Sequence, residues 1–159
     1  MAAATERDPI RAHYRRAVAS RRVGEKAQCA CGESRPEALI SGSKPVICAK
    51  CRRMTKGQSI MDDHHVAGRS NSPVTIPVPV SDHRAVLSPA QYDWPKETLE
   101  NPEELDLLKA AACIRGYIDC QDYLTNKILR PIAELLERRT KLERRSRKDQ
   151  RNVTKSAEA

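Results

Sequence analysis

The sequence GQSIMDDHHVAGRSNSPVTIPVPVSDHRAVL, residues 57–87, carries three of the four histidines in the chain. Its apolar run at 59–61 is typical of a strand that ends at residues 62–65. Glycine, asparagine and a Ser-Pro pair predict a turn over 67–73. Residues 75–80 alternate β-branched residues with prolines. This pattern predicts a short edge strand, because proline cannot donate a hydrogen bond to a neighbouring strand.

The end of this stretch predicts a helix. Ser81 and Asp82 are favourable N-cap residues, so we expect a helix that runs to Leu87 and carries His83 in its first turn. The order of elements is then strand, turn, strand and helix. Imidazoles lie at the end of the first strand and at the start of the helix, where side chains from two elements can converge on one cation.

His64 and His65 are adjacent in the predicted strand. Neighbouring side chains of a strand point to opposite faces, so two consecutive histidines cannot easily bind one ion together. They can divide the work, because neutral imidazole is both a common metal ligand and, with a pKa near ~6.5, a suitable general base. We interpret Asp62 and Asp63 as solvated charges at the strand end rather than as ligands.

Several residues of this stretch resemble the motif of the HNH endonucleases, the nucleases with a ββα-metal fold. They are His64-His65-Val66, the loop Gly68-Arg69-x-Asn71, and the later His83. The resemblance implies that the chain hydrolyses phosphodiester bonds in DNA by metal-dependent attack of water. It also implies products that carry a 5′-phosphate and a 3′-hydroxyl.

The resemblance further implies a role for each residue of the motif. His65 corresponds to the general base that deprotonates water. His64 and His83 correspond to the ligands of a catalytic divalent ion, either Mg²⁺ or a transition metal. Asn71 corresponds to the central asparagine, although Thr75 lies nearer to the place where that residue usually falls.

Four cysteines form a second motif. Cys29 and Cys31 make one closely spaced pair, and Cys48 and Cys51 make another. Each pair can form a tight turn that points two sulfurs at one position, and four thiolates make the tetrahedral shell of a structural zinc ion. Residues 37–47 predict a β-hairpin between the pairs, as in a zinc ribbon. Disulfides are the alternative, but a cytosolic chain would keep these thiols reduced.

Length and composition limit the size of the core. The chain has 159 residues, of which only 3% are aromatic and 31% are charged. A core of this kind often needs a structural metal. No apolar run approaches the ~18 residues that span a membrane, and the N-terminus has no apolar segment of a secretory signal. We therefore expect a cytoplasmic protein with no membrane partner.

The net charge of +8 is concentrated at the two ends of the chain. Residues 1–23 hold six arginines and two acids, and residues 137–151 hold eight Lys/Arg and three acids. This distribution favours DNA as the partner, with solvated helix faces as the alternative. Arg69 and Arg84 flank the histidines and could bind phosphates bidentately, with a solvated surface position as the equal alternative for each.

Together these features predict an α+β protein with a small zinc-stapled ββα-metal core. The core would occupy residues 25–95, between a basic N-terminal helix over 1–24 and a C-terminal αα-hairpin over 96–145. Pro131 is expected to kink or restart the second helix of that hairpin. Residues 146–159 predict a basic disordered tail. A second copy of the chain could pack on the C-terminal helices, which would make a homodimer.

Two functions from different classes fit this pattern. One is a metal-dependent DNA endonuclease of HNH type, in which a histidine activates the attacking water. The other is a zinc-ribbon nucleic-acid-binding or adaptor protein without catalysis. The predicted histidine ligands favour the non-catalytic function, because Mg²⁺ prefers oxygen ligands to imidazole.

Overall fold

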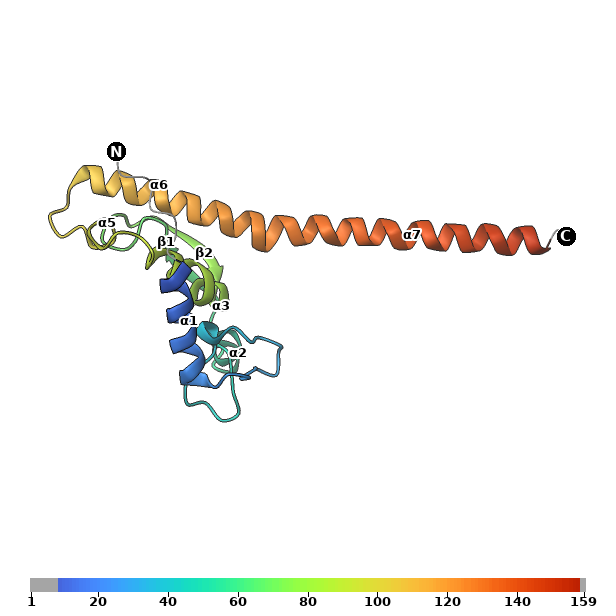
Figure 1. Cartoon of the computed structure of the whole chain (residues 1–159), viewed down its shortest axis with the longest axis horizontal. Helices are drawn as coiled ribbons and strands as arrows, with labels where there is room; N and C mark the ends of the chain where they lie inside the picture. The colour runs from blue at the N-terminus through green and yellow to red at the C-terminus, as the bar shows by residue number, and fades with distance from the viewer. Residues whose placement is uncertain (1–8, 158–159) are drawn as a thin grey trace. The chain divides into compact units, whose positions relative to one another are not determined.

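The computed structural model describes the backbone of residues 9–157 and the side chains of residues 10–145 (Figure 1). The chain forms two compact units, Met1–Cys120 and Gln121–Ala159. It combines helices with one two-stranded sheet, as in a small α+β fold. The elements in chain order are α1 (Pro9–Val23), the 3₁₀ helix η1 (Pro36–Ala38), α2 (Ala49–Thr55), β1 (Met61–His65), β2 (Thr75–Pro79), α3 (Val80–Asp82), the π-helix η2 (His83–Leu87), α4 (Ser88–Gln91), α5 (Lys96–Glu100), α6 (Asp106–Tyr123), the π-helix η3 (Leu124–Leu129) and α7 (Arg130–Ala157).

The predicted order of strand, turn, strand and helix is confirmed in the first unit. β1 and β2 pair antiparallel, with Met61 opposite Pro79 and His65 opposite Thr75. The segments α3, η2 and α4 then follow one another without a break. This arrangement places His64 and His65 at the end of one strand and His83 in the helix that follows the other.

Two boundaries differ from the prediction. β1 begins at Met61, two residues after the predicted start at Ser59, and ends at His65, within the predicted end at residues 62–65. The helix begins at Val80 with Pro79 as its N-cap, so Ser81 and Asp82 lie within the helix and do not cap it.

Buried residues form two small clusters in the first unit. One contains Cys29, Leu39 and Cys48, and the other contains Ala67, Trp94 and Ala112. Trp94 is fixed further by a hydrogen bond of 2.9 Å from its ring N–H to Asp119. Neither cluster is large, as the low aromatic content predicts, so polar contacts carry more of the organisation of this unit.

The segment between the cysteine pairs is less regular than predicted. Instead of a full β-hairpin it contains η1 and one isolated bridge, in which Leu39 pairs with Cys48. A hydrogen bond of 2.9 Å from the N–H of Ile40 to the carbonyl of Ile47 extends this bridge. The N-terminal helix is present as α1 and ends before Gly24, while its predicted start at residues 1–8 lies outside the described residues.

The predicted αα-hairpin is wrong, because helical residues follow one another from Asp106 to Ala157 without a turn. Pro131 neither breaks nor reverses the helix. It lies two residues after η3, and the wider turn of a π-helix relieves the clash that a proline ring makes with an ordinary helical turn. Helical backbone also continues through residues 146–157, where the sequence predicted a disordered tail.

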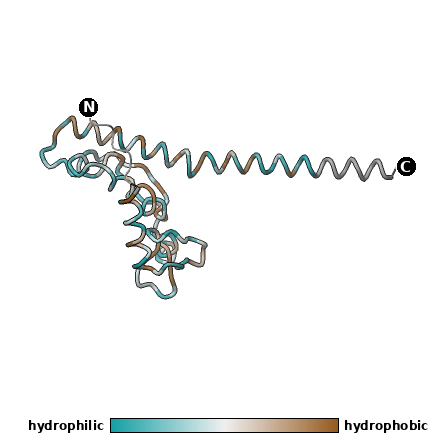
Figure 2. Tube along the Cα trace, in the orientation of Figure 1, coloured by the Kyte–Doolittle hydropathy of each residue, from teal (hydrophilic) through white to brown (hydrophobic). Residues whose placement is uncertain are grey.

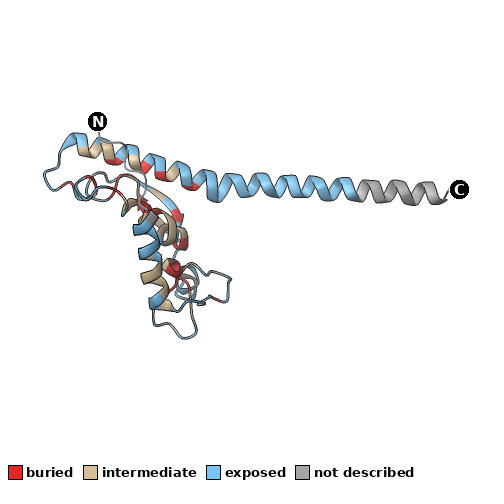
Figure 3. Ribbon diagram, in the orientation of Figure 1, coloured by how far each residue is buried: buried red, intermediate tan, exposed pale blue. Residues whose placement is uncertain are grey.

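The second unit exposes a row of apolar side chains. All residues from 124 to 145 are exposed (Figure 3), and hydrophobic and hydrophilic residues alternate along this helix (Figure 2). Ile128, Leu135 and Leu142 recur at intervals of seven residues, with exposed fractions of 37%, 55% and 62%. A second copy of the chain could cover such a row, and the homodimer stays a prediction. In the part of the chain that the structure describes, no helix is both long and apolar enough to cross a membrane.

Gly116 explains why a poor helix-forming residue lies in the middle of α6. A Cβ atom at this position would lie 1.8 Å from the carbonyl oxygen of Val66, the residue that follows β1. Only glycine therefore allows α6 to approach the end of the strand that carries the histidines.

We predict that Gly116→Ala destabilises the protein by about 1–3 kcal/mol, because the added methyl group forces the helix away from Val66. Helix propensity alone would make Gly116→Ala stabilising, because alanine favours a helix more than glycine does. Urea unfolding of the full chain measures the effect. Ala110→Gly, at an exposed position of the same helix, is the control and should cost about 1 kcal/mol through propensity. Equal or higher stability of Gly116→Ala would contradict the close contact.

Candidate functional site

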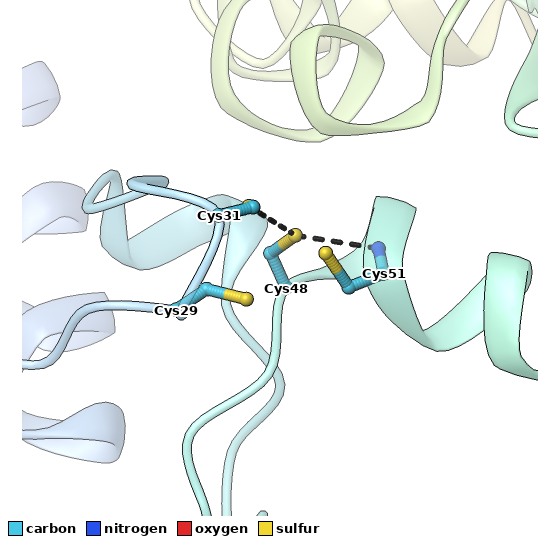
Figure 4. A group of neighbouring side chains, drawn as sticks. All are labelled: Cys29, Cys31, Cys48 and Cys51. Atoms are coloured by element: carbon cyan, nitrogen blue, oxygen red, sulfur yellow. Dashed lines mark hydrogen bonds between the residues drawn. The ribbon is translucent and has the colours of Figure 1, made fainter.

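The four cysteines gather at one position in the first unit (Figure 4). Their sulfur atoms all lie within 4.8 Å of one another, and those of Cys31 and Cys48 are 3.6 Å apart. Cys29 and Cys48 are buried, Cys51 is half-buried and Cys31 is exposed. No disulfide joins them. This cluster can therefore hold a metal ion, as the spacing of the cysteines predicted.

Local backbone geometry aims these sulfurs at one another. Gly32 has a φ of 92°, which allows the tight turn in which its N–H donates to the carbonyl of Cys29 at 2.8 Å. Cys48 is the N-cap of α2, and its sulfur accepts a hydrogen bond of 3.4 Å from the N–H of Cys51. The second pair is thus held by the first turn of a helix, a feature that its spacing alone did not predict.

Contacts within the cluster change the acidity of its thiols. A hydrogen bond from the backbone N–H of Cys31 lowers the pKa of the Cys29 thiol to about 6, although burial opposes the shift. Hydrogen bonds with Cys31 and Cys48 raise the pKa of the Cys51 thiol to about 12, and burial raises that of Cys48. The Cys29 thiolate therefore forms readily, whereas the thiolates of Cys48 and Cys51 form less readily unless a bound metal ion offsets the repulsion between them.

The histidines form a second site on the hairpin and the helix. Asp62 and His64 are two residues apart in β1, so their side chains share one face of the strand. The rings of His64 and His83 meet edge to face with their centroids 5.2 Å apart. The Nδ1 atom of His83 lies 2.7 Å from Oδ2 of Asp62. Since a carboxylate accepts hydrogen bonds, Nδ1 of His83 carries a proton, and Nε2 is the nitrogen that has the lone pair when the ring is neutral.

His64 is almost fully buried, with 1% of its surface exposed. Burial, together with the nearby charges of His83 and His65, lowers the pKa of the His64 ring to about 4. Its Nδ1 atom has no hydrogen-bond partner among the described residues. Its Nε2 lies 3.4 Å from the amide of Gln91, which makes a much shorter contact of 2.6 Å with the carbonyl of His65. A buried polar atom without a partner marks a place where a ligand can be accommodated.

Asp62 connects the histidines to the cysteine cluster. The guanidinium of Arg53, in α2, donates to Oδ1 of Asp62 at 3.2 Å and to the carbonyl of Met61 at 2.9 Å. Burial raises the pKa of the Asp62 carboxyl, but the hydrogen bonds from His83 and Arg53 outweigh it, so this pKa lies below its usual value. Asp62 is therefore a charged, bonded residue of the site rather than the solvated charge that the sequence predicted. Asp63 is exposed.

His65 occupies the opposite face of β1. Its Nδ1 lies 3.3 Å from the carbonyl oxygen of Ser72, which can only accept, so the proton is on Nδ1 and Nε2 keeps a lone pair. Its partner across the sheet is Thr75, which therefore shares its face. The ring is half-buried and reaches the surface of the unit.

The side chain of Asn71 bonds to the backbone of the turn and of α5. Its amide donates to the carbonyls of Ala67 at 3.1 Å and Thr98 at 2.8 Å. Its own oxygen accepts from Asn101, which is 2% exposed, at 3.0 Å. Asn71 thus ties the turn after β1 to α5, and it is the Ser72 carbonyl that orients the ring of His65.

The two arginines predicted to bind phosphates have different surroundings. Arg69 is exposed in the turn between the strands. Arg84 is also exposed, but its Nε donates to the carbonyl of Glu37 at 3.1 Å, which fixes the guanidinium beside η1.

The two groups differ in how many metal ligands they offer. Among the described residues, the cysteines are the one group of three or more Cys, His, Asp or Glu side chains whose ligand atoms lie within 4.8 Å of one another. The histidine site offers two imidazoles with available lone pairs and a carboxylate that holds one of them. The sequence pattern missed Asp62, Arg53 and Gln91, although the two-residue spacing of Asp62 and His64 in a strand could have indicated the first.

No protein-family model, curated protein or solved structure matches this chain.

We predict that His64 makes the stability of the protein depend on pH between about 6.5 and 4. Below pH 6.5 the unfolded chain binds a proton at His64 that the folded chain does not, so folding stability falls as pH falls through this window. Relative to a His64→Asn variant, the wild type should lose roughly 3 kcal/mol between these limits. Urea unfolding of both proteins at stepped pH measures this difference.

A His13→Asn variant controls for loss of a histidine at an exposed position of α1. If the wild type and His64→Asn lose stability in parallel across the window, then the His64 ring is not held in its neutral form.

Proposed function

We propose that this chain is a metal-dependent DNA endonuclease of HNH type, in which the cysteine cluster holds a structural zinc ion. The observation that carries the proposal is the arrangement of three histidines on a ββα unit. His64 and His83 meet with ring centroids 5.2 Å apart, and His65 projects from the other face of the same strand.

The residues present fit a divalent ion at the histidine pair in two respects. His83 donates its Nδ1 proton to Asp62, and a carboxylate in this position commonly orients a metal-binding imidazole through its second nitrogen. The buried Nδ1 of His64 has no partner among the described residues. His83 and His64 would therefore hold the ion, which is expected to be a transition metal or Mg²⁺. When bound, such an ion stabilises the charge that develops on the scissile phosphate and on the leaving oxygen.

The residues of the chain perform the proton transfer. The lone pair on Nε2 of His65 accepts a proton from the attacking water, while the Ser72 carbonyl holds the Nδ1 proton in place. Asp62 keeps the His83 ring in a fixed orientation, and Arg53 keeps Asp62 charged. DNA supplies the phosphodiester, and the basic character of the chain favours its approach.

Zinc is the proposed occupant of the cysteine cluster. Its four sulfur atoms lie within 4.8 Å of one another, and four thiolates are a typical shell of a structural zinc ion. Four protein ligands leave no open coordination position, so this ion would support the fold and take no part in the reaction. We expect the cluster to matter for stability, since Cys29 and Cys48 belong to one of the two buried clusters.

A second candidate function is a zinc-containing DNA-binding or adaptor protein without catalysis. The observation that favours it is the ligand count at the histidines, where fewer than three close Cys, His, Asp or Glu ligands are found among the described residues. Such a site binds a divalent ion weakly unless DNA contributes a ligand.

If the chain is a nuclease, we expect the full-length protein to nick supercoiled plasmid DNA when Mg²⁺, Mn²⁺ or Ni²⁺ is added. His65→Ala should lower the nicking rate by about 10²–10⁴-fold, because it removes the base. Asp62→Asn should raise the metal concentration needed for half-maximal activity by about 10–100-fold, because the His83 ring loses its anionic partner. Gel densitometry over a metal titration measures both effects.

His13→Ala is the matched control, since His13 is exposed on α1. DNA binding without nicking in any of the three metals would support the adaptor and rule out the nuclease. If His65→Ala nicks DNA at the wild-type rate, then His65 is not the general base.

The zinc assignment predicts one tightly bound zinc ion per chain. Cys48→Ser should lose it and unfold at a lower temperature, whereas Cys113→Ser, an exposed position on α6, should keep it. Zinc affinity should fall as pH falls, because protons compete for the thiolates. Elemental analysis and thermal unfolding test these expectations. A wild-type protein that folds equally well after complete removal of zinc would contradict the structural role.

A further inference from the structure

A cavity of about 230 Å³ lies between α2 and the start of the helix that carries His83. Four cationic side chains line it, and they come from two elements: Arg52, Arg53 and Lys56 from α2 and its C-cap, and Arg84 from η2. One carboxylate, that of Asp62, lines the same cavity. We call these five residues the α2 cation pocket.

The charges of the pocket are not balanced by its own residues. Arg53 and His83 already use the Asp62 carboxylate. In the described part of the chain, the side chains of Arg52 and Lys56 have no hydrogen-bond or ion-pair partner, and both are exposed. Like charges that surround one cavity repel each other, and an anion in the cavity would remove this cost.

Ordinary helix electrostatics does not account for the whole group. Cations at the C-terminal end of a helix are favoured by its dipole, which is sufficient reason for Arg52 and Lys56 to occur there. It gives no reason for Arg84, which belongs to another element and is held beside the cavity by its bond to the Glu37 carbonyl. Since that bond uses only Nε, the two terminal nitrogens of Arg84 remain able to bind a phosphate in a bidentate manner.

The position of the pocket relates it to the histidines. Asp62 lines the cavity with one oxygen bonded to Arg53 and the other bonded to Nδ1 of His83. An anion in the cavity would therefore lie one side chain away from the His64–His83 pair. The cavity holds several water volumes, so it admits a phosphodiester group together with waters.

We propose that the α2 cation pocket binds a backbone phosphate of DNA next to the histidine pair. The inference rests on the proposed function for its ligand, but it concerns binding and not cleavage. It gives α2 a second role, since this helix supplies both a cysteine of the cysteine cluster and the cations that bind the DNA backbone.

The test uses the full chain in a His65→Ala background, so that any DNA cleavage by the proposed mechanism is absent. Fluorescence anisotropy of a labelled DNA duplex, without added divalent metal, gives the dissociation constant at several salt concentrations. Arg52→Gln with Lys56→Gln should weaken binding by about ten-fold and lower the slope of log K against log salt by about 0.9, which corresponds to the loss of one phosphate contact.

The matched control removes the same charge from the same module outside the pocket. Lys26→Gln with Lys50→Gln changes two exposed lysines, one of them in α2, that do not line the cavity. This control should change affinity less than two-fold and leave the slope nearly unchanged. Zinc content and thermal unfolding of both double variants show whether each remains folded.

The outcomes separate the pocket from the nuclease. Selective loss of affinity in the pocket variant supports the inference, even if the wild type nicks DNA in no metal. Equal loss of affinity in both double variants overturns the inference, because net charge alone would then explain DNA binding. Unchanged affinity in the pocket variant also overturns it, even if the wild type nicks DNA.

Discussion

Four sulfur atoms within 4.8 Å of one another impose the main physical constraint on this chain. Four closely spaced thiolates repel one another unless a cation offsets their charge, and two of these cysteines, Cys29 and Cys48, belong to one of the two buried clusters. Leu39 is the one other fully buried side chain in their cluster. With 3% aromatic residues, the chain has little else with which to fix the relative positions of its loops. The geometry of the first unit therefore depends on how these sulfurs are held.

The influence of the cluster extends through α2. This helix begins at Ala49 with Cys48 as its N-cap, carries Cys51 in its first turn, and places Arg53 against β1. From there a continuous chain of charged hydrogen bonds leads through Asp62 to the ring of His83. A second connection runs from the loop of the first cysteine pair, where Arg35 binds Asp82 at 2.7 Å. The helix that carries His83 is thus bonded to both halves of the cysteine module, which makes the orientation of this histidine sensitive to the state of the cluster.

His64 and His65 are consecutive residues of β1, but the hairpin places their rings in two different environments. His64 faces inward, loses its solvent and is held neutral, whereas His65 faces outward with its proton fixed by the Ser72 carbonyl. Polar bonds behind the turn maintain this separation. Asn71 and Asn101 bond to each other and to backbone carbonyls, and Gly116 lets α6 close on Val66. The Ser72 carbonyl, rather than Asn71 itself, orients the half-buried ring of His65.

The sequence by itself determined the parts of this protein that depend on short-range spacing. Two close cysteine pairs, a strand-turn-strand-helix pattern and the opposite faces of His64 and His65 all follow from local backbone periodicity. Only the tertiary structure decided which partners those residues meet. Asp62 is a partner of His83, Asn71 bonds to α5, and α6 continues into a π-helix and α7 without a turn, none of which the local pattern indicated. The physical reason is that such contacts join segments distant in sequence, and long-range packing overrides the local preference of a solvated aspartate or a helix-breaking proline.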